Sequence, residues 1–235
     1  SHRATHQYLQ DASRERESSR KYPLQFLCDF AYSVLDDETG DLLEYRHLLK
    51  HPKYKDVWSQ SFGKEIRRLA TVTETIAFVS KQQIPRDWRR DITYGRIVCA
   101  YRSEKKDPYR TRITAGGNLL AYDGNVTTHT ASMETIKCHW NSVVSTKGAK
   151  YCTGDISNMY LCSWLKDAEY VRFHIDQIPP RIIEHYKLQG LVHKGYVYAR
   201  IKQAWYGLKQ SGKIAHDDLV AHLQKYGYER MAQTE

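Results

Sequence analysis

Hydrophobic side chains recur every three or four residues in three stretches of the chain, which is the period of an amphipathic helix. The pattern predicts one helix over residues 53–70, a second over 132–145, and a third between Ser211 and Gly227. The side chains expected to face inward are Tyr54, Val57, Trp58, Phe62, Ile66 and Leu69 in the first helix, Met133, Ile136, Trp140, Val143 and Val144 in the second, and Ile214, Leu219, Val220, Leu223 and Tyr226 in the third.

Residues that begin helices support these boundaries. Ser132 or Thr130 is placed to cap the second helix, and Ser211 to cap the third, because a hydroxyl can accept a hydrogen bond from a free N–H group of the first turn. Pro179-Pro180 predicts the start of a further short helix.

Segments typical of strands lie between the predicted helices. Residues 96–102 and 109–115 flank a charged, proline-containing turn at 104–108, which predicts a hairpin. Further strands are predicted over residues 150–155, 170–175 and 196–201. Strands and helices mix without strict strand–helix–strand alternation, so the predicted class is α+β with a mixed or antiparallel sheet.

Composition is typical of a chain that forms a core. Hydrophobic residues make up 41% of the 235 residues. The longest apolar runs, such as Ile76 to Val79, are far shorter than a membrane-spanning helix, so we expect no membrane partner. The five cysteines have no zinc-binding spacing and are expected to be small buried residues in a reducing compartment. Residues 1–40 are interpreted as a polar lead segment without a secretory signal.

Positive charge is concentrated in one part of the chain, whose net charge is +9. Residues 185–216 contain no Asp or Glu, and a second basic stretch covers 86–112. Cations interleaved with aromatic rings suit a phosphate backbone and stacked bases, although a solvated face on an ordinary basic domain would have the same charge. The side chains concerned in the first stretch are Lys187, Lys194, Arg200, Lys202, Lys209 and Lys213, with Tyr186, Tyr196, Tyr198, Trp205 and Tyr206 between them.

The segment from Lys150 to Leu161 places an acid, Asp155, at the end of a predicted strand and an aromatic residue, Tyr160, five positions later. A carboxylate held at a strand end can bind Mg²⁺, and the carbonyl of Ile156 could add another oxygen ligand. The simpler interpretation is that Asp155 caps the turn after its strand. We expect this predicted strand to lie beside the strand predicted over 196–201.

In the second informative segment, that later strand leads into Ala204-Trp205-Tyr206-Gly207-Leu208-Lys209-Gln210-Ser211-Gly212 and then a helix. Together the two segments resemble the reverse transcriptases of copia-type retroelements. The resemblance covers roughly residues 41–230, including 43–46 and 58–62 near its start. It implies a right-hand polymerase fold, with a polar lead (1–40), a fingers-like region (41–120) and the front part of a palm (121–235).

The resemblance also implies a role for each matching residue. Asp155 and the carbonyl of Ile156 would hold Mg²⁺, two ions in the intact polymerase, for nucleotidyl transfer. Tyr160 would pack under the incoming sugar, or simply in the core. Arg110 and Arg112 would grip the triphosphate, or be an ordinary solvated pair.

Five further positions of the matching segments would bind nucleic acid or substrate. Gln210 would bind substrate, and together with the small Ser211 and Gly212 it would let the helix approach the template–primer closely. Lys202 and Lys209 would contact phosphates without reading sequence. The implied partners are an RNA or DNA template with its primer, deoxynucleoside triphosphates and the rest of a polyprotein, inside the cell in a cytoplasmic particle or the nucleus.

Two departures from the family pattern change the expectation. The family completes its metal site with an Asp-Asp pair in a later hairpin, whereas Asp217-Asp218 lies inside a predicted helix. We therefore expect a truncated polymerase, inactive by itself, or alternatively a non-catalytic nucleic-acid-binding relic. An ordinary basic α+β domain is the third interpretation.

Residues 37–40 are not the Asp-Thr-Gly of a protease and are interpreted as a turn between a β-like segment and a helix.

Overall fold

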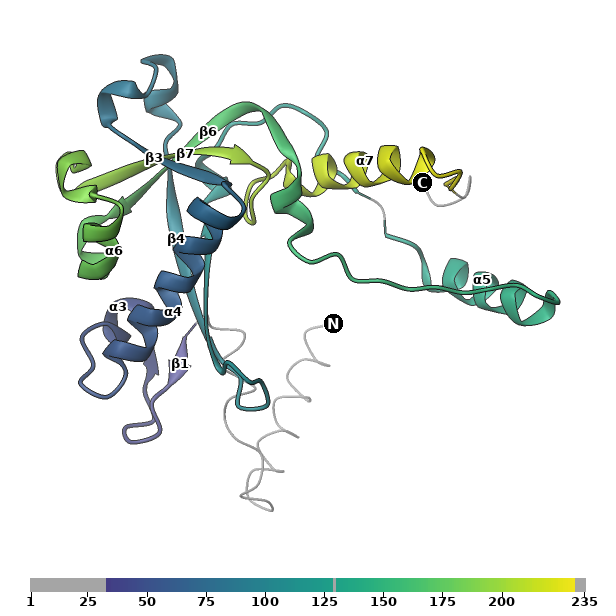
Figure 1. Cartoon of the computed structure of the whole chain (residues 1–235), viewed down its shortest axis with the longest axis horizontal. Helices are drawn as coiled ribbons and strands as arrows, with labels where there is room; N and C mark the ends of the chain where they lie inside the picture. Colours follow the sequence, from purple (N-terminus) through teal and green to yellow (C-terminus); the bar gives the residue numbers. More distant parts are fainter. Residues whose placement is uncertain (1–32, 129, 231–235) are drawn as a thin grey trace, which may run out of the picture. The chain divides into compact units, whose positions relative to one another are not determined.

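The computed structural model describes residues 33–128 and 130–230, so the predicted lead up to residue 32 and Cys28 lie outside the described residues. The described chain has the predicted α+β class, with five α-helices, a mixed five-stranded sheet and a small hairpin (Figure 1). Contacts divide it into two compact units. The first contains the chain up to Trp58 together with Val98–Thr111, and the second contains Ser59–Ile97 with the chain from Arg112 onward. The division into fingers and palm stays a prediction.

The first unit contains the antiparallel pair β1 (Val34–Leu35) and β2 (Leu42–Leu43), then α3 (Tyr45–Leu48) and the start of α4 (Lys55–Arg67). The turn at residues 37–40 therefore joins two strands, and the expectation that it leads straight into a helix is wrong. The pairing of β1 with β2 closes this turn locally. Strands of two residues are too short to give a recognisable alternation in the sequence, so the pattern does not predict this pairing.

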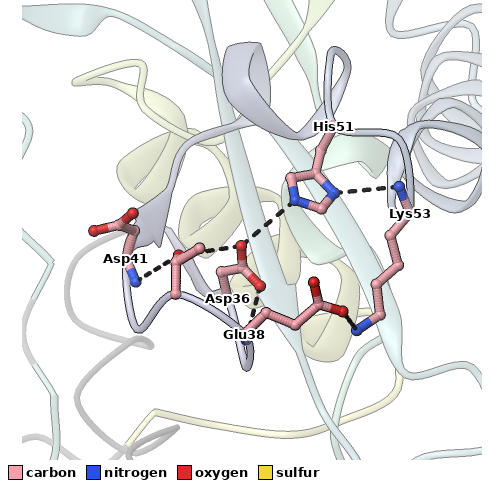
Figure 2. A network of polar contacts seen from close by, with 6 residues as sticks. Asp36, Glu38, Asp41, His51 and Lys53 are labelled. Carbon is pink, nitrogen blue, oxygen red and sulfur yellow. Dashed lines mark hydrogen bonds and ion pairs between the residues drawn. The ribbon is translucent and has the colours of Figure 1, made fainter.

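Polar contacts around Asp36 hold the hairpin turn (Figure 2). Its buried carboxylate accepts hydrogen bonds from the Glu38 N–H at 3.1 Å and the Thr39 hydroxyl at 3.2 Å, and His51 Nε2 lies 3.4 Å away. The Lys53 N–H donates to His51 Nδ1 at 3.2 Å, so the ring proton of a neutral His51 is on Nε2, facing Asp36. The backbone hydrogen bond from Glu38, above all, lowers the pKa of Asp36. These contacts give the acidic turn a structural role.

The large sheet has the strand order β3-β7-β6-β4-β5. β7 pairs antiparallel with β3 and β6, whereas β4 pairs parallel with β6. The predicted hairpin is confirmed as β4 and β5, which are neighbours in the sheet. The strands span β3 (Ile76–Val79), β4 (Thr93–Tyr101), β5 (Tyr109–Ala115), β6 (Trp164–His174) and β7 (Tyr196–Gln203).

One face of this sheet forms the core of the second unit. Alternate positions of β6 and β7 are buried on that face, and α4 together with the π-helical turn after it adds three side chains with no exposed area. Each buried Val, Leu, Ile or Phe side chain contributes about 1.5–3 kcal/mol of hydrophobic free energy. The residues are Val171, Phe173, Val197, Ala199 and Ile201 from the strands, Phe62 and Ile66 from α4, and Leu69 from the π-helical turn.

The predicted helices are all present. α4 continues into a π-helical turn (Arg68–Val72), and α5 spans Met133–Ser145. Ser132 caps α5, because its hydroxyl accepts a hydrogen bond from the Thr135 N–H at 3.1 Å. The remaining helices are α6 (Pro180–His185) and α7 (Ser211–Gln224). None of the helices in residues 33–128 and 130–230 is long and apolar enough to cross a membrane.

Three expectations from the pattern are wrong. Residues 150–155 form no strand, so none ending at Asp155 lies beside β7, where β6 pairs instead. The apolar stripe of α5 is exposed (Trp140 by 55%, Val144 by 83%), as are Leu223 near the end of α7 and Tyr226 just beyond it. Periodicity predicts that a segment can pair or pack, but a partner surface must exist for it to do so.

The prediction for the cysteines is also wrong in part. Cys99 is buried, and burial raises the pKa of its thiol to about 12. The other three described cysteines, Cys138, Cys152 and Cys162, are exposed. They lie on α5 or in the segments that follow it, where little of the chain is covered.

Candidate functional site

The turn that joins β7 to α7 is held by its own hydrogen bonds. The Ser211 hydroxyl donates to the Trp205 carbonyl at 2.7 Å and accepts from the Trp205 N–H at 2.8 Å. Gln210 holds the N-cap position of α7 and Ser211 is the first residue of the helix, so the prediction that Ser211 caps this helix is wrong. With Trp205 fully buried, the turn is anchored at both ends.

Gly207 lets this turn lie against the end of β5. Its φ of +96° is in the region that favours glycine, and a side chain there would overlap the carbonyl oxygen of Ala115. The Ala115 N–H donates to the Tyr206 carbonyl at 2.7 Å, which fixes the approach. On the other side, a side chain at Gly117 would overlap the Gly207 carbonyl. The glycine of the Tyr-Gly-Leu-Lys-Gln segment is thus required by close backbone packing.

Three side chains from separate segments come together beside this turn. The Arg112 guanidinium lies 6.0 Å from the ring centroid of Tyr206, and that ring lies 5.1 Å from the ring of Tyr160 at an angle of 49°. We call these residues the Arg–Tyr–Tyr cluster. Arg112 is exposed and makes no ion pair with a described residue, while both tyrosines are half-buried. The start of α7 is also near, because a side chain at Gly212 would stand 3.9 Å from the Tyr160 hydroxyl.

A chain of buried polar contacts positions the turn that carries Tyr160. Glu65, only 7% exposed, accepts two hydrogen bonds from Arg68 at 2.6 and 2.8 Å and one from the Ile113 N–H at 3.3 Å. Arg68 also donates to the side-chain oxygen of Asn158 at 2.6 Å. Asn158, at a φ of +57°, begins the 3₁₀ turn that includes Tyr160. Arg68 therefore connects α4 and β5 to the turn of the cluster.

Gln210 faces the core. It is 4% exposed and donates to the Glu169 carboxylate at 3.2 Å. Burial raises the pKa of Glu169, opposed by this hydrogen bond and reinforced by the negative charges of Asp91 and Asp167. The predicted contact of Gln210 with substrate stays a prediction, and the structure gives it a partner that the sequence did not indicate.

Glu169→Gln is expected to raise the melting temperature at pH 8 by about 2–4 °C, the shift that ~1 kcal/mol produces in a chain of this size. Because the folded state binds a proton at Glu169 more tightly than the unfolded state, stability falls as pH rises from the ordinary carboxyl range, near 4.5, through the folded pKa. The gain should therefore vanish near pH 4. Thermal melts at both pH values, with the exposed Glu184→Gln as control, test this. An equal gain at pH 4 and pH 8 would contradict it.

Among the other residues predicted to bind phosphate, Lys202 and Lys209 lie in the second unit and Arg110 lies on β5. Lys202 lies 3.5 Å from Glu74 and 5.9 Å from the ring of Trp164, whereas Lys209 is exposed in the turn. Arg110 is exposed on β5, two residues before Arg112 and on the same side of the strand. The phosphate contacts predicted for Lys209 and Arg110 are compatible with their exposure, whereas Lys202 is half-buried beside Glu74. All three contacts stay predictions.

Asp155 and Ile156 are exposed in an irregular segment. No group of three or more His, Cys, Asp or Glu side chains able to hold a metal comes together within residues 33–128 and 130–230. One carboxylate is too few ligands for two Mg²⁺ ions. Magnesium binding at Asp155 and Ile156 stays a prediction.

Several residues of the candidate site were not assigned a role from the sequence. Tyr206 was noted as an aromatic residue of a basic stretch and of the second motif, with no role of its own, and Glu169, just before the strand predicted over 170–175, was given no role. Glu65 and Arg68 are opposite charges three positions apart on a predicted helix. This spacing indicates an ion pair, but such a pair is usually solvent-exposed.

Comparison of the chain with models of protein families, with curated proteins and with solved structures gives no match. The evidence for function therefore consists of the two motifs and the geometry of the turn after β7.

Proposed function

We propose that this chain is part of an RNA-directed DNA polymerase of the copia type, and that the Arg–Tyr–Tyr cluster binds the incoming deoxynucleoside triphosphate. One observation carries the proposal. Arg112 and Tyr160, to which the resemblance gives adjacent parts of the nucleotide, are 48 positions apart in sequence and both adjoin Tyr206. Tyr206 itself begins the Tyr-Gly-Leu-Lys-Gln segment of the second motif.

The chemistry of each side chain suits a part of the nucleotide. Arg112 is exposed and lacks a carboxylate partner among the described residues, so its planar guanidinium is available to pair with phosphate oxygens. Tyr160 and Tyr206 offer aromatic surface for a sugar or base beside that cation. The proposal extends to a right-hand polymerase fold, with a template and primer held by the basic stretches.

Magnesium would supply charge neutralisation of the triphosphate and activation of the primer hydroxyl when bound. Asp155 is the proposed ligand of this chain.

A non-catalytic nucleic-acid-binding relic is the second candidate. The exposed, irregular segment that carries Asp155 favours it, because such a protein needs a basic, aromatic surface and no rigidly held metal ligand. The two candidates differ in nucleotide binding, which only the polymerase requires.

The test is titration with deoxythymidine triphosphate and Mg²⁺, followed by calorimetry. We expect Arg112→Gln to weaken binding about 10–100-fold, because a charge-assisted contact to phosphate contributes ~1.5–3 kcal/mol. Arg181→Gln, an exposed arginine on α6, is the matched control and should bind as the unaltered chain does. Primer extension by the 235-residue chain is not expected.

Two results would overturn the proposal. Absence of triphosphate binding by the unaltered chain would favour the relic. Equal losses in Arg112→Gln and Arg181→Gln would remove the cluster from the binding site.

A further inference from the structure

The face of the sheet opposite the core carries a second set of cations and aromatic rings. On β6 and β7, Arg172 is the cross-strand partner of Tyr198, and His174 is the partner of Tyr196. These positions alternate with the buried core positions, so their side chains project from the other face.

A small hydrophobic cluster covers the middle of this face. The segment after β3 folds back so that Ile84 packs with Tyr170 and Tyr198, and Trp88 meets Tyr170 with ring centroids 6.2 Å apart. Tyr196 is only partly buried at the margin of this cluster. An aromatic edge therefore remains accessible on the face.

Three cations adjoin the cluster. Lys81 Nζ lies 4.7 Å from the ring centroid of Tyr198, and the Arg172 guanidinium lies 5.0 Å from that of Tyr196. Arg89 is fixed by hydrogen bonds to the carbonyls of Ile84 at 3.0 Å and Gln82 at 3.4 Å. The aromatic rings and carbonyls hold all three positive groups in place without neutralising them.

These cations repel one another. No ion pair joins Lys81, Arg89 or Arg172 to an acid in the described part of the chain, and the nearby Asp176 lies 3.5 Å from His174. Burial, then the charges of Arg89 and Arg172, lower the pKa of Lys81. A ligand with several negative charges would relieve this repulsion, whereas a neutral partner would cover the cations without neutralising them.

We infer that the face formed by Lys81, Arg89, Arg172 and Tyr196 is a docking surface for single-stranded nucleic acid, separate from the Arg–Tyr–Tyr cluster. Cations held around a partly exposed ring suit the phosphates and stacked bases of a flexible strand. A rigid duplex would offer phosphates but no free base for Tyr196. The inference rests on the proposed function only for the class of ligand.

Fluorescence anisotropy with labelled oligothymidylate tests this surface. The double variant Lys81→Glu, Arg172→Glu should bind at least about tenfold more weakly at low salt, with a log–log salt slope shallower by about 0.7 for each phosphate that the surface no longer binds. Tyr196→Leu should weaken binding about tenfold, because a base can no longer stack on the ring. The charge-matched control is Lys147→Glu, Lys225→Glu, which changes two exposed lysines elsewhere. Lys81→Gln, Arg172→Gln repeats the test with a milder change, and thermal melting verifies folding.

Each outcome decides the inference. A weakening confined to the variants of this face supports it. Equal weakening in the control variant, or no binding of oligothymidylate by the unaltered chain, would overturn it. Titration with deoxythymidine triphosphate separates the two proposals. Triphosphate binding without strand binding ends only this inference, and strand binding that depends on this face without triphosphate binding ends only the polymerase assignment.

Discussion

Replacing Gly207 by alanine is expected to lower the free energy of unfolding by about 3 kcal/mol or more. A φ of +96° costs an L-residue ~1–3 kcal/mol, and the added methyl group would also displace the Ala115 carbonyl at the end of β5. The hydrogen bond from the Ala115 N–H to Tyr206 should weaken with it. Urea denaturation measures the change.

Gly190→Ala is the matched control, because no atom lies within 4 Å of the position that its side chain would take. Its effect should be within about 0.5 kcal/mol. If the two alanine variants were equally stable, the backbone contact between the turn and β5 would not be as close as the structure has it. A folded but loosened Gly207→Ala protein should also lose affinity for the triphosphate, since Tyr206 adjoins the substituted residue.

Arg68→Met should destabilise the chain by about 2–4 kcal/mol. The substitution leaves the carboxylate of Glu65 buried without its partner, and such uncompensated charges cost ~3–5 kcal/mol when fully enclosed. Arg68 is 24% exposed, so water reduces this cost. Arg67→Met removes the neighbouring exposed arginine and should have little effect.

The double variant Glu65→Gln, Arg68→Met separates charge burial from packing. It should recover part of the lost stability, because no unpaired charge remains. Hydrogen exchange at residues 158–162 should stay faster than in the unaltered chain, since the bond to Asn158 is still missing. Unchanged exchange there would show that Arg68 does not position the turn of Tyr160.

Local patterns were sufficient for most of the secondary structure. The helical period of residues 53–70 predicted α4, the serine before α5 predicted its cap, and the charged turn at 104–108 predicted the β4–β5 hairpin. These features depend on contacts between residues close in sequence, so the pattern contains the information that forms them.

Expectations that required a distant partner were less reliable. The β-like composition of residues 150–155 predicted a strand, but β7 already pairs with β3 and β6 on its two edges. The apolar stripe of α5 predicted a buried face, yet that face is exposed. An amphipathic pattern indicates that a segment can pack against a surface, but it does not identify that surface.

For the candidate site, residue types and motif spacing indicated which residues have suitable chemistry: Arg112 and Tyr160, and a glycine in the turn after β7. The tertiary structure alone decided that Tyr206 lies between that arginine and that tyrosine. It also decided that Glu65 and Arg68 hold Asn158, and that Gln210 turns to Glu169. The physical reason is that these contacts join segments dozens of residues apart, and no local spacing encodes which distant side chains meet once the sheet has formed.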